Sequence, residues 1–283
     1  MENNAQPYRS VLYIPGSKAR ALEKAKTLPV DAIIFDLEDA VAPDEKATAR
    51  ALLAETLRNT DYGPRKCIVR VNGADTEWGA EDLSTFIDVA PDAILLPKVE
   101  QPASVAAVAG LLKGDTTIWA MMETPRGILN AASLAAAPKM EGFVMGTNDL
   151  AKDLGSRSRA AMTTSLQLCL LAARAEGLVC VDGVYNAFKD EDGLRTECEE
   201  GRDMGFDGKT LIHPAQVAVA NAVFGPGEDE LELARRQIAA YEQAKADGQG
   251  VAVVDGKIVE NLHVETATRL LAKADAIKLL ETS

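Results

Sequence analysis

The sequence is poor in cysteine, histidine and aromatic residues, and each shortage excludes a class of protein. Its 283 residues include four cysteines, two histidines and 5% aromatic side chains. The cysteines form no C-x-x-C pair and have no histidine at ligand spacing, so neither a disulfide framework nor a structural zinc site is expected. No apolar stretch approaches the roughly 20 residues that a membrane-spanning helix needs.

Basic residues are also in the minority, with 30 Lys and Arg against 43 Asp and Glu, for a net charge of −13 at pH 7. That surface repels polyanions, which excludes general nucleic-acid binding, and an anionic small molecule must be met by a metal ion or a few placed cations. The first residues, up to Pro7, lack the basic and apolar pattern of a signal peptide. The sequence therefore predicts a cytoplasmic protein with no membrane contact.

Eight short apolar runs alternate with longer helix-patterned stretches before residue 225. The runs are rich in Val, Ile, Leu or Met with little polar alternation, as in parallel strands buried on both faces. They are Ser10–Pro15, Asp31–Leu37, Cys67–Val71, Asp92–Pro97, Thr117–Met122, Gly142–Met145, Leu178–Val181 and Lys209–Ile212. The stretches between them, such as Glu45–Arg58 and Leu166–Glu176, have helical composition and length.

The repeat predicts an α/β fold, a closed (β/α)8 TIM barrel, because eight units of about 27 residues match the spacing of that barrel. A doubly wound sheet is the rival, but no G-x-G-x-x-G turn is present. We predict a catalytic barrel domain over residues 1–225 and a C-terminal cap of helices and a hairpin over residues 226–283. The hairpin is expected around Asp255-Gly256. The cap would cover the barrel rim or pack on a neighbouring subunit.

Glu123 and Asp149 follow two consecutive predicted strands, and the carboxyl ends of barrel strands meet on one rim. Adjacent strands lie about 4.8 Å apart, so the two carboxylates need a shared proton or cation, and their oxygens suit Mg²⁺. Asp149 could instead cap the following helix. No G-x-S-x-G, H-E-x-x-H or P-loop motif occurs, which removes the commonest hydrolase, metalloprotease and kinase classes.

Arg70 lies inside an apolar run, where an unpaired guanidinium would be costly to bury. It either forms a structural ion pair with Glu38 or Asp39, or clamps a substrate carboxylate or a developing oxyanion. In an extended chain only one of these two carboxylates faces the barrel mouth. One would orient Arg70 or a metal-bound water, and the other would cap the helix that starts near Pro43.

Two further groups stay open between a functional and a structural role. Lys18 and Arg20 begin the first helix, where they could meet a phosphate together with free helix N–H groups or simply be solvated. His213 ends the eighth run and is either a scaffold group or an acid–base group, whereas His263 is expected to be incidental.

Seven ordered motifs make the chain resemble the citrate lyase β-subunit-like group of the HpcH/HpaI aldolase superfamily. They are Ser10–Gly16, Phe35–Val41, Val69–Asn72, Leu96–Lys98, Glu123–Pro125, Gly146–Leu150 and Ile212–Pro214. The resemblance covers essentially the whole chain, including Val254–Glu260 in the tail. Within the group, the sequence looks most similar to malyl-CoA lyases and their (3S)-malyl-CoA thioesterase relatives.

The resemblance implies a Mg²⁺-dependent carbon–carbon lyase. Such an enzyme cleaves or forms a 3-hydroxyacyl-CoA, such as malyl-CoA or citramalyl-CoA, from acetyl-CoA and a 2-oxo acid such as glyoxylate or pyruvate. One alternative is a thioesterase that hydrolyses (3S)-malyl-CoA at the same site. A second is a β-subunit-like component of a larger citrate lyase complex. The family is usually homotrimeric or hexameric, with the tail covering a neighbouring subunit's barrel mouth.

The resemblance also assigns roles to individual residues. Glu123 and Asp149 match the metal ligands, Arg70 matches the group that steadies the oxo acid and the thioester enolate, and Glu38 and Asp39 match the acidic pair that supports it. The remaining substrate and coenzyme A contacts are expected from Tyr13, Pro15, Lys18, Arg20, Lys98 and Asn148, together with Arg70.

The tail departs from the lyase pattern at one position. Where lyases of this type carry the proton-transferring Asp of a Met-Ile-Asp or Met-Val-Asp motif, this chain has Ile258-Val259-Glu260. Glu260 keeps a carboxylate but moves it one methylene outward, and a displacement of about 1 Å can cost about a hundredfold in rate. We expect Glu260 either to act as the acid–base group in a different pose or to let water reach the thioester, which would favour hydrolysis.

Overall fold

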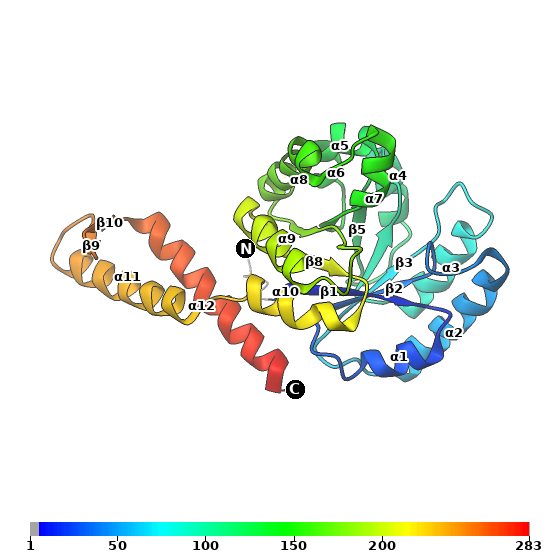
Figure 1. Ribbon diagram of the computed structural model, residues 1–283, viewed down its shortest axis with the longest axis horizontal. Helices are drawn as coiled ribbons and strands as arrows, with labels where there is room; N and C mark the ends of the chain where they lie inside the picture. The colour runs from blue at the N-terminus through cyan, green and yellow to red at the C-terminus, as the bar shows by residue number, and fades with distance from the viewer. Residues whose placement is uncertain (1–5, 283) are drawn as a thin grey trace. The chain divides into compact units, whose positions relative to one another are not determined.

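The computed structural model describes residues 6–282, and eight of its strands close into a parallel barrel (Figure 1). Each strand pairs with the next along the chain, and the last pairs with the first. The strands are β1 (Ser10–Pro15), β2 (Ala32–Asp36), β3 (Lys66–Arg70), β4 (Ala93–Leu96), β5 (Thr117–Met122), β6 (Met140–Met145), β7 (Val179–Asp182) and β8 (Gly208–Leu211). The predicted TIM barrel is confirmed, with strand ends shifted by a few residues at most.

Helices follow the strands and form the outer ring of the barrel (Figure 1). They are α1 (Ala19–Ala25), α2 (Lys46–Asn59), α3 (Gly79–Val89), α4 (Pro102–Ala109), α5 (Pro125–Leu129), α6 (Ala131–Ala135), α7 (Thr147–Leu154), α8 (Thr163–Glu176), α9 (Glu191–Met204) and α10 (Val217–Phe224). Short 3₁₀ turns occupy η1 (Pro43–Glu45), η2 (Arg159–Met162) and η3 (Pro214–Gln216).

Alternate residues of each strand enter two different apolar layers, which explains why the strands show no polar alternation. The barrel interior is filled by Val11, Ile34, Ile68, Leu95, Trp119, Val144 and Val181. Their neighbours along the strands, including Leu12, Ile33, Phe35, Val69 and Ile94, pack outward beneath the helices. The barrel interior is therefore a packed core and not a pore.

The carboxylate of Glu141 on β6 accepts four hydrogen bonds near the amino-terminal end of the barrel. It accepts hydrogen bonds from Lys66 Nζ at 2.9 Å, Trp119 Nε1 at 3.0 Å, Tyr8 Oη at 3.3 Å and the hydroxyl of Thr117. Burial alone would raise the pKa of Glu141, but the Thr117 hydrogen bond and the Lys66 charge outweigh it and lower that pKa. The network ties β3, β5 and β6 together far from the candidate site.

The chain's internal contacts separate residues 8–224 from the segment that begins at Gly225. That segment contains α11 (Glu228–Ala246), β9 (Ala252–Val254), β10 (Lys257–Val259) and α12 (Asn261–Thr282). The two strands form the predicted antiparallel hairpin, whose turn places Asp255 and Gly256 at φ values of 50° and 74°. Two successive left-handed residues are what a two-residue type I′ hairpin turn requires.

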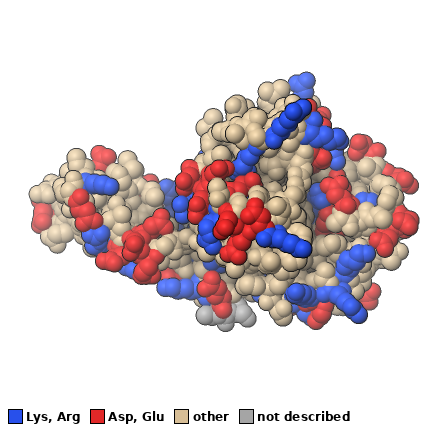
Figure 2. Space-filling view, in the orientation of Figure 1, with Lys and Arg blue, Asp and Glu red and all other residues tan. Residues whose placement is uncertain are grey.

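Acidic and basic side chains are interspersed over the face that Figure 2 shows. Within residues 6–282, no helix is both long enough and apolar enough to cross a membrane.

Candidate active site

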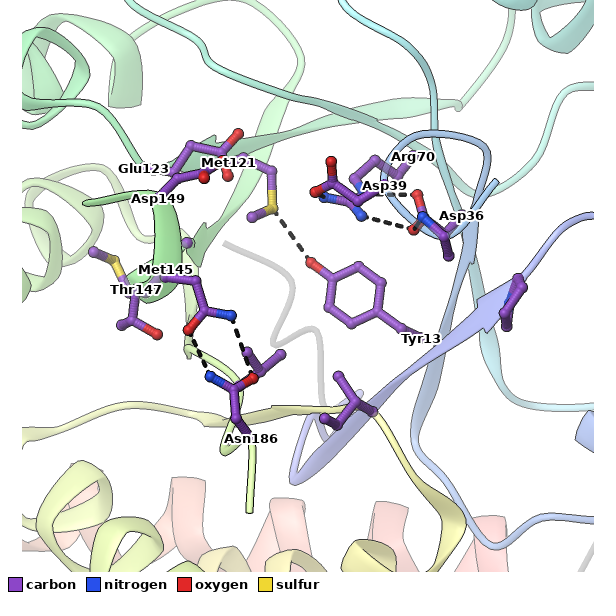
Figure 3. Close-up of a pocket in the computed structure, with 16 residues that line it drawn as sticks. Tyr13, Asp36, Asp39, Arg70, Met121, Glu123, Met145, Thr147, Asp149 and Asn186 are labelled. Atoms are coloured by element: carbon purple, nitrogen blue, oxygen red, sulfur yellow. Dashed lines mark hydrogen bonds and ion pairs between the residues drawn. The ribbon is translucent and has the colours of Figure 1, made fainter. Parts of the chain in front are cut away.

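A cavity of about 340 Å³ opens at the carboxyl-terminal ends of the strands (Figure 3). One part of its wall is charged and another is apolar. The charged residues are Asp36, Asp39, Arg70, Glu123 and Asp149, and the apolar residues include Met121, Met145, Val184 and Ile212. Tyr13, Pro15, Asn148 and Asn186 complete much of the lining. The cavity therefore lies at the rim where the strand-end rule placed the candidate site.

Arg70 is held by a carboxylate that the sequence analysis did not single out. Its Nε and Nη2 donate to the two oxygens of Asp36, both at 2.7 Å, and the two residues are register partners at the ends of β3 and β2. Burial would lower the pKa of Arg70, but the charge of Asp36 raises it well above its ordinary value. The sequence signal for Asp36 was an acidic residue near the end of the apolar run Asp31–Leu37.

Glu38 and Asp39 both reach Arg70, at 2.8 and 3.3 Å from its Nη1, and of the two only Asp39 is among the residues that line the cavity. The expected alternation of the two side chains assumed an extended chain. Instead, Asp36 accepts the backbone N–H groups of Glu38 and Ala40 at 2.9 and 3.0 Å, so the chain turns directly after β2. Neither carboxylate caps the helical turn at Pro43, which has no side-chain cap.

Lys46 also holds the turn after β2, and the sequence analysis did not identify this residue. Its Nζ donates to the carbonyl oxygens of Leu37 and Glu38 and to Asn72 Oδ1, at 2.9, 2.7 and 2.7 Å. Lys46 is 6% exposed, and burial lowers its pKa. From sequence, a lysine at the start of a helix is expected to be solvated. Its three acceptors here belong to other segments of the chain, so no local pattern indicates that Lys46 is buried.

Glu123 follows β5 and is 3% exposed, and its Oε1 accepts the backbone N–H of Lys98 at 2.8 Å. Burial, the largest influence, raises the pKa of Glu123 to about 7. Asp149 lies in the first turn of α7 on the same side of the cavity (Figure 3). It does not cap α7, whose N-cap is Gly146 without a side-chain bond, so the capping interpretation of Asp149 was wrong.

The donor set of Glu123 and Asp149 fits Mg²⁺. Within residues 6–282, no three or more His, Cys, Asp or Glu side chains cluster as a complete metal cage. Mg²⁺ does not need one, since it usually binds through one or two carboxylates and keeps several waters. Gly146 makes room for this arrangement, because a Cβ at that position would lie 2.3 Å from Glu123 Cβ.

The ammonium of Lys98 lies between two carboxylates, those of Glu38 and Asp149. Its Nζ lies 3.3 Å from Glu38 Oε1 and 3.7 Å from Asp149 Oδ2, and its backbone is left-handed with a φ of 48°. Burial would lower the pKa of Lys98, but the charge of Glu38 raises it.

Lys98 is not among the residues that line the cavity, whereas the predicted contact residues Tyr13, Pro15 and Asn148 are. The Tyr13 ring lies 5.0 Å from the Arg70 guanidinium, its hydroxyl donates to Met121 Sδ at 3.4 Å, and Pro15 lies beside it in the wall. Burial raises the pKa of Tyr13, so the hydroxyl stays protonated. Asn148 and Asn186 both line the cavity and exchange amide hydrogen bonds at 3.3 and 2.8 Å, which Figure 3 marks with dashed lines at Asn186.

The remaining candidates do not line this cavity. Lys18 and Arg20 are exposed, and Lys18 lies 3.7 Å from Glu45. His213 caps η3 by accepting the Ala215 N–H on Nδ1, and its ring stacks on Phe188 at 4.6 Å, which favours the scaffold interpretation.

Two tail residues contact each other within the C-terminal segment. The backbone N–H of Glu260 donates to His263 Nδ1 at 3.0 Å, so His263, expected to be incidental, has a local structural contact.

A TIM barrel with a buried arginine and several carboxylates at its carboxyl-terminal rim has the arrangement of a barrel enzyme, since the active sites of such enzymes lie at that face. The sequence profile of the HpcH/HpaI aldolase/citrate lyase family matches residues 9–214, and the chain belongs to that family.

Two proteins of Cereibacter sphaeroides and one solved structure illustrate the range of relatives. A (3S)-malyl-CoA thioesterase is 66% identical over the full length of both chains. An L-malyl-CoA/β-methylmalyl-CoA lyase is 33% identical, covering 96% of each chain. The crystal structure of CitE from Mycobacterium tuberculosis with magnesium, acetoacetate and coenzyme A has a TM-score of 0.79 at 30% identity, covering 96% of this chain and 99% of CitE.

Proposed function

We propose that the protein is a Mg²⁺-dependent thioesterase that hydrolyses (3S)-malyl-CoA to malate and coenzyme A. The observation that carries this proposal is the full-length 66% identity with a (3S)-malyl-CoA thioesterase. It reverses the order of the sequence-based expectation, in which the carbon–carbon lyase came first and hydrolysis was the alternative. The magnesium in the CitE structure and the Glu123–Asp149 pair support the choice of metal.

Bound by Glu123 and Asp149, Mg²⁺ would supply Lewis-acid polarisation of the substrate's oxygen atoms. Arg70, locked by Asp36, would place positive charge where the thioester oxygen becomes negative during attack by water. Because its guanidinium is already oriented, little reorganisation is needed in the transition state.

Hydrolysis forms a bond from water oxygen to the acyl carbon and breaks the carbon–sulfur bond. The water proton must pass to a base, and the coenzyme A thiolate must be protonated. Glu38 suits the first role, since burial raises its pKa while its side chain stays near Arg70 and Lys98. The apolar wall at Met145, Val184 and Ile212 would limit the entry of further water.

Carbon–carbon cleavage of malyl-CoA to acetyl-CoA and glyoxylate is the second candidate, favoured by the 33% identical lyase. It would use the same metal pair, with Arg70 holding the thioester enolate and Glu260 of a neighbouring subunit moving the hydroxyl proton. A role as a β-subunit-like component of a citrate lyase complex has less support, because the most similar of these relatives is a thioesterase along its full length. The homotrimer or hexamer and the cytoplasmic location remain predictions.

The deciding experiment incubates the purified protein with (3S)-malyl-CoA and Mg²⁺, then measures malate, glyoxylate, acetyl-CoA and free thiol. We expect malate and free thiol in equal amounts. Glyoxylate with acetyl-CoA as the main products would contradict the thioesterase proposal and support the lyase.

Two variants test the site itself. Glu123→Gln and Asp149→Asn should each reduce turnover by at least about a hundredfold and weaken Mg²⁺ binding. Retention of both properties by either variant would overturn the assignment of that residue as a ligand.

A further inference from the structure

Lys98 has an unusual backbone for its residue type. It is one of four non-glycine residues with positive φ among those that the structure describes. A left-handed conformation costs a side-chain-bearing residue about 1 kcal/mol or more, so the surrounding structure must impose it. In this conformation its N–H reaches Glu123 Oε1 at 2.8 Å and thereby links the ends of β4 and β5.

The side chain of Lys98 makes a second and separate connection. Its ammonium lies between Glu38 Oε1 and Asp149 Oδ2, at 3.3 and 3.7 Å, and the side chain is 55% exposed. Lys98 therefore contacts both proposed metal ligands, Glu123 through the backbone and Asp149 through the ammonium.

The carboxylates around the ammonium of Lys98 differ in the cation with which they pair. Asp36, Glu38 and Asp39 all pair with Arg70. Asp149 does not, and Lys98 is the cation paired with it in the described part of the chain. A divalent cation bound beside Asp149 would repel the ammonium, because both are positively charged. The two would also compete for the same carboxylate.

We propose that Lys98 is a positioning residue that sets the divalent-metal affinity of the site through two separable parts. The left-handed backbone aims Glu123 and strengthens metal binding. The ammonium is an internal counter-cation that the metal must displace, and it weakens binding. The inference rests on the proposed Mg²⁺ site at Glu123 and Asp149 and adds the residue that adjusts its affinity.

The two parts of this proposal predict that two uncharged variants of Lys98 change the affinity for Mn²⁺ in opposite directions. Lys98→Asn keeps a residue type that tolerates positive φ and removes the ammonium, so Mn²⁺ should bind about threefold to tenfold more tightly. Lys98→Val also removes the charge, but its β-branched side chain disfavours positive φ, so Mn²⁺ should bind at least about tenfold more weakly. Lys98→Arg keeps the charge and should stay within about twofold of wild type.

The measurement is Mn²⁺ titration followed by electron paramagnetic resonance, checked with Mg²⁺ calorimetry, without any coenzyme A ester. Circular dichroism and thermal melts establish that each variant is folded. If Lys98→Val fails to fold, Lys98→Ala supplies the comparison, because it also removes the charge and its Cβ disfavours positive φ, so it should bind Mn²⁺ more weakly than Lys98→Asn. Lys98→Gly accepts positive φ at no steric cost and should tighten binding as Asn does.

The outcomes separate the inference from the proposed function. Equal shifts in Asn and Val would overturn the backbone part, and unchanged or weaker binding in Asn and Gly would overturn the counter-cation part. If the wild-type protein binds neither Mn²⁺ nor Mg²⁺, the proposed metal-dependent function itself fails. If the wild type binds metal and every variant matches it, only the inference about Lys98 fails.

Discussion

Arg70 and Asp36 face each other as register partners on β3 and β2 and share two hydrogen bonds of 2.7 Å. The same Asp36 carboxylate accepts two backbone N–H groups of the turn that carries Glu38. One side chain therefore orients the guanidinium and shapes the loop beside it. This arrangement leads to the first prediction.

Arg70→Lys should lower kcat/KM at least about a hundredfold, because an ammonium cannot reproduce the planar two-bond pairing with Asp36. Asp36→Asn should cost about tenfold to a hundredfold by releasing Arg70 and the turn. Steady-state kinetics with (3S)-malyl-CoA provide the measurement. Arg9→Lys is the matched control, since Arg9 pairs in the same way with Asp31 outside the cavity and should change stability without a comparable loss of kcat/KM.

Gly146→Ala should weaken metal binding and destabilise the barrel by about 1–3 kcal/mol, because its new Cβ would lie 2.3 Å from Glu123 Cβ. Urea denaturation and Mn²⁺ titration measure the two effects. Gly110→Ala is the control, since its nearest neighbours lie at an ordinary 3.6 Å. Similar behaviour of the two variants would show that space beside Glu123 is not limiting.

Acid should remove the stabilisation that Glu141 provides. Its pKa is lowered from the ordinary value of 4.5 in the folded protein, so the carboxylate stabilises the fold above pH 4.5, and this contribution is lost as the pH falls through the lower folded pKa. At pH 7, Glu141→Gln should reduce the free energy of unfolding by about 1–3 kcal/mol. Urea denaturation at several pH values should find the difference from wild type shrinking below pH 4.5. A constant difference would contradict this account, and the exposed Glu176→Gln serves as control.

Glu260→Asp should raise the ratio of glyoxylate to malate formed from (3S)-malyl-CoA. The shorter side chain restores the proton-transferring residue expected in a lyase tail and moves the carboxylate by one methylene, a scale that matters for reactive geometry. Product analysis by chromatography gives the ratio directly. Glu242→Asp, an exposed change in the same C-terminal segment, should leave it unaltered. An unchanged ratio in Glu260→Asp would exclude this residue as the determinant of product choice.

The barrel and the position of its cavity could be predicted from sequence because they depend on local patterns. Apolar runs of strand length recur at regular spacing, and polar residues such as Glu123 and Arg70 stand at or near the run ends. The partners of those residues could not be predicted in the same way. Asp36 pairs with Arg70 only through the register of β2 on β3, and Lys46 gains its acceptors only after the chain turns beyond β2. Both depend on tertiary geometry that no spacing along the chain encodes.

The double role of Asp36 also bears on how substrate preference could change in evolution. A substitution there disturbs the guanidinium and the loop together, so the polar half of the cavity is hard to alter in small steps. Val184 and Ile212 are partly exposed in the apolar wall, so each can change size with less disturbance of the packed core. New acyl preferences would therefore arise first through this apolar wall, while the polar half stays constant.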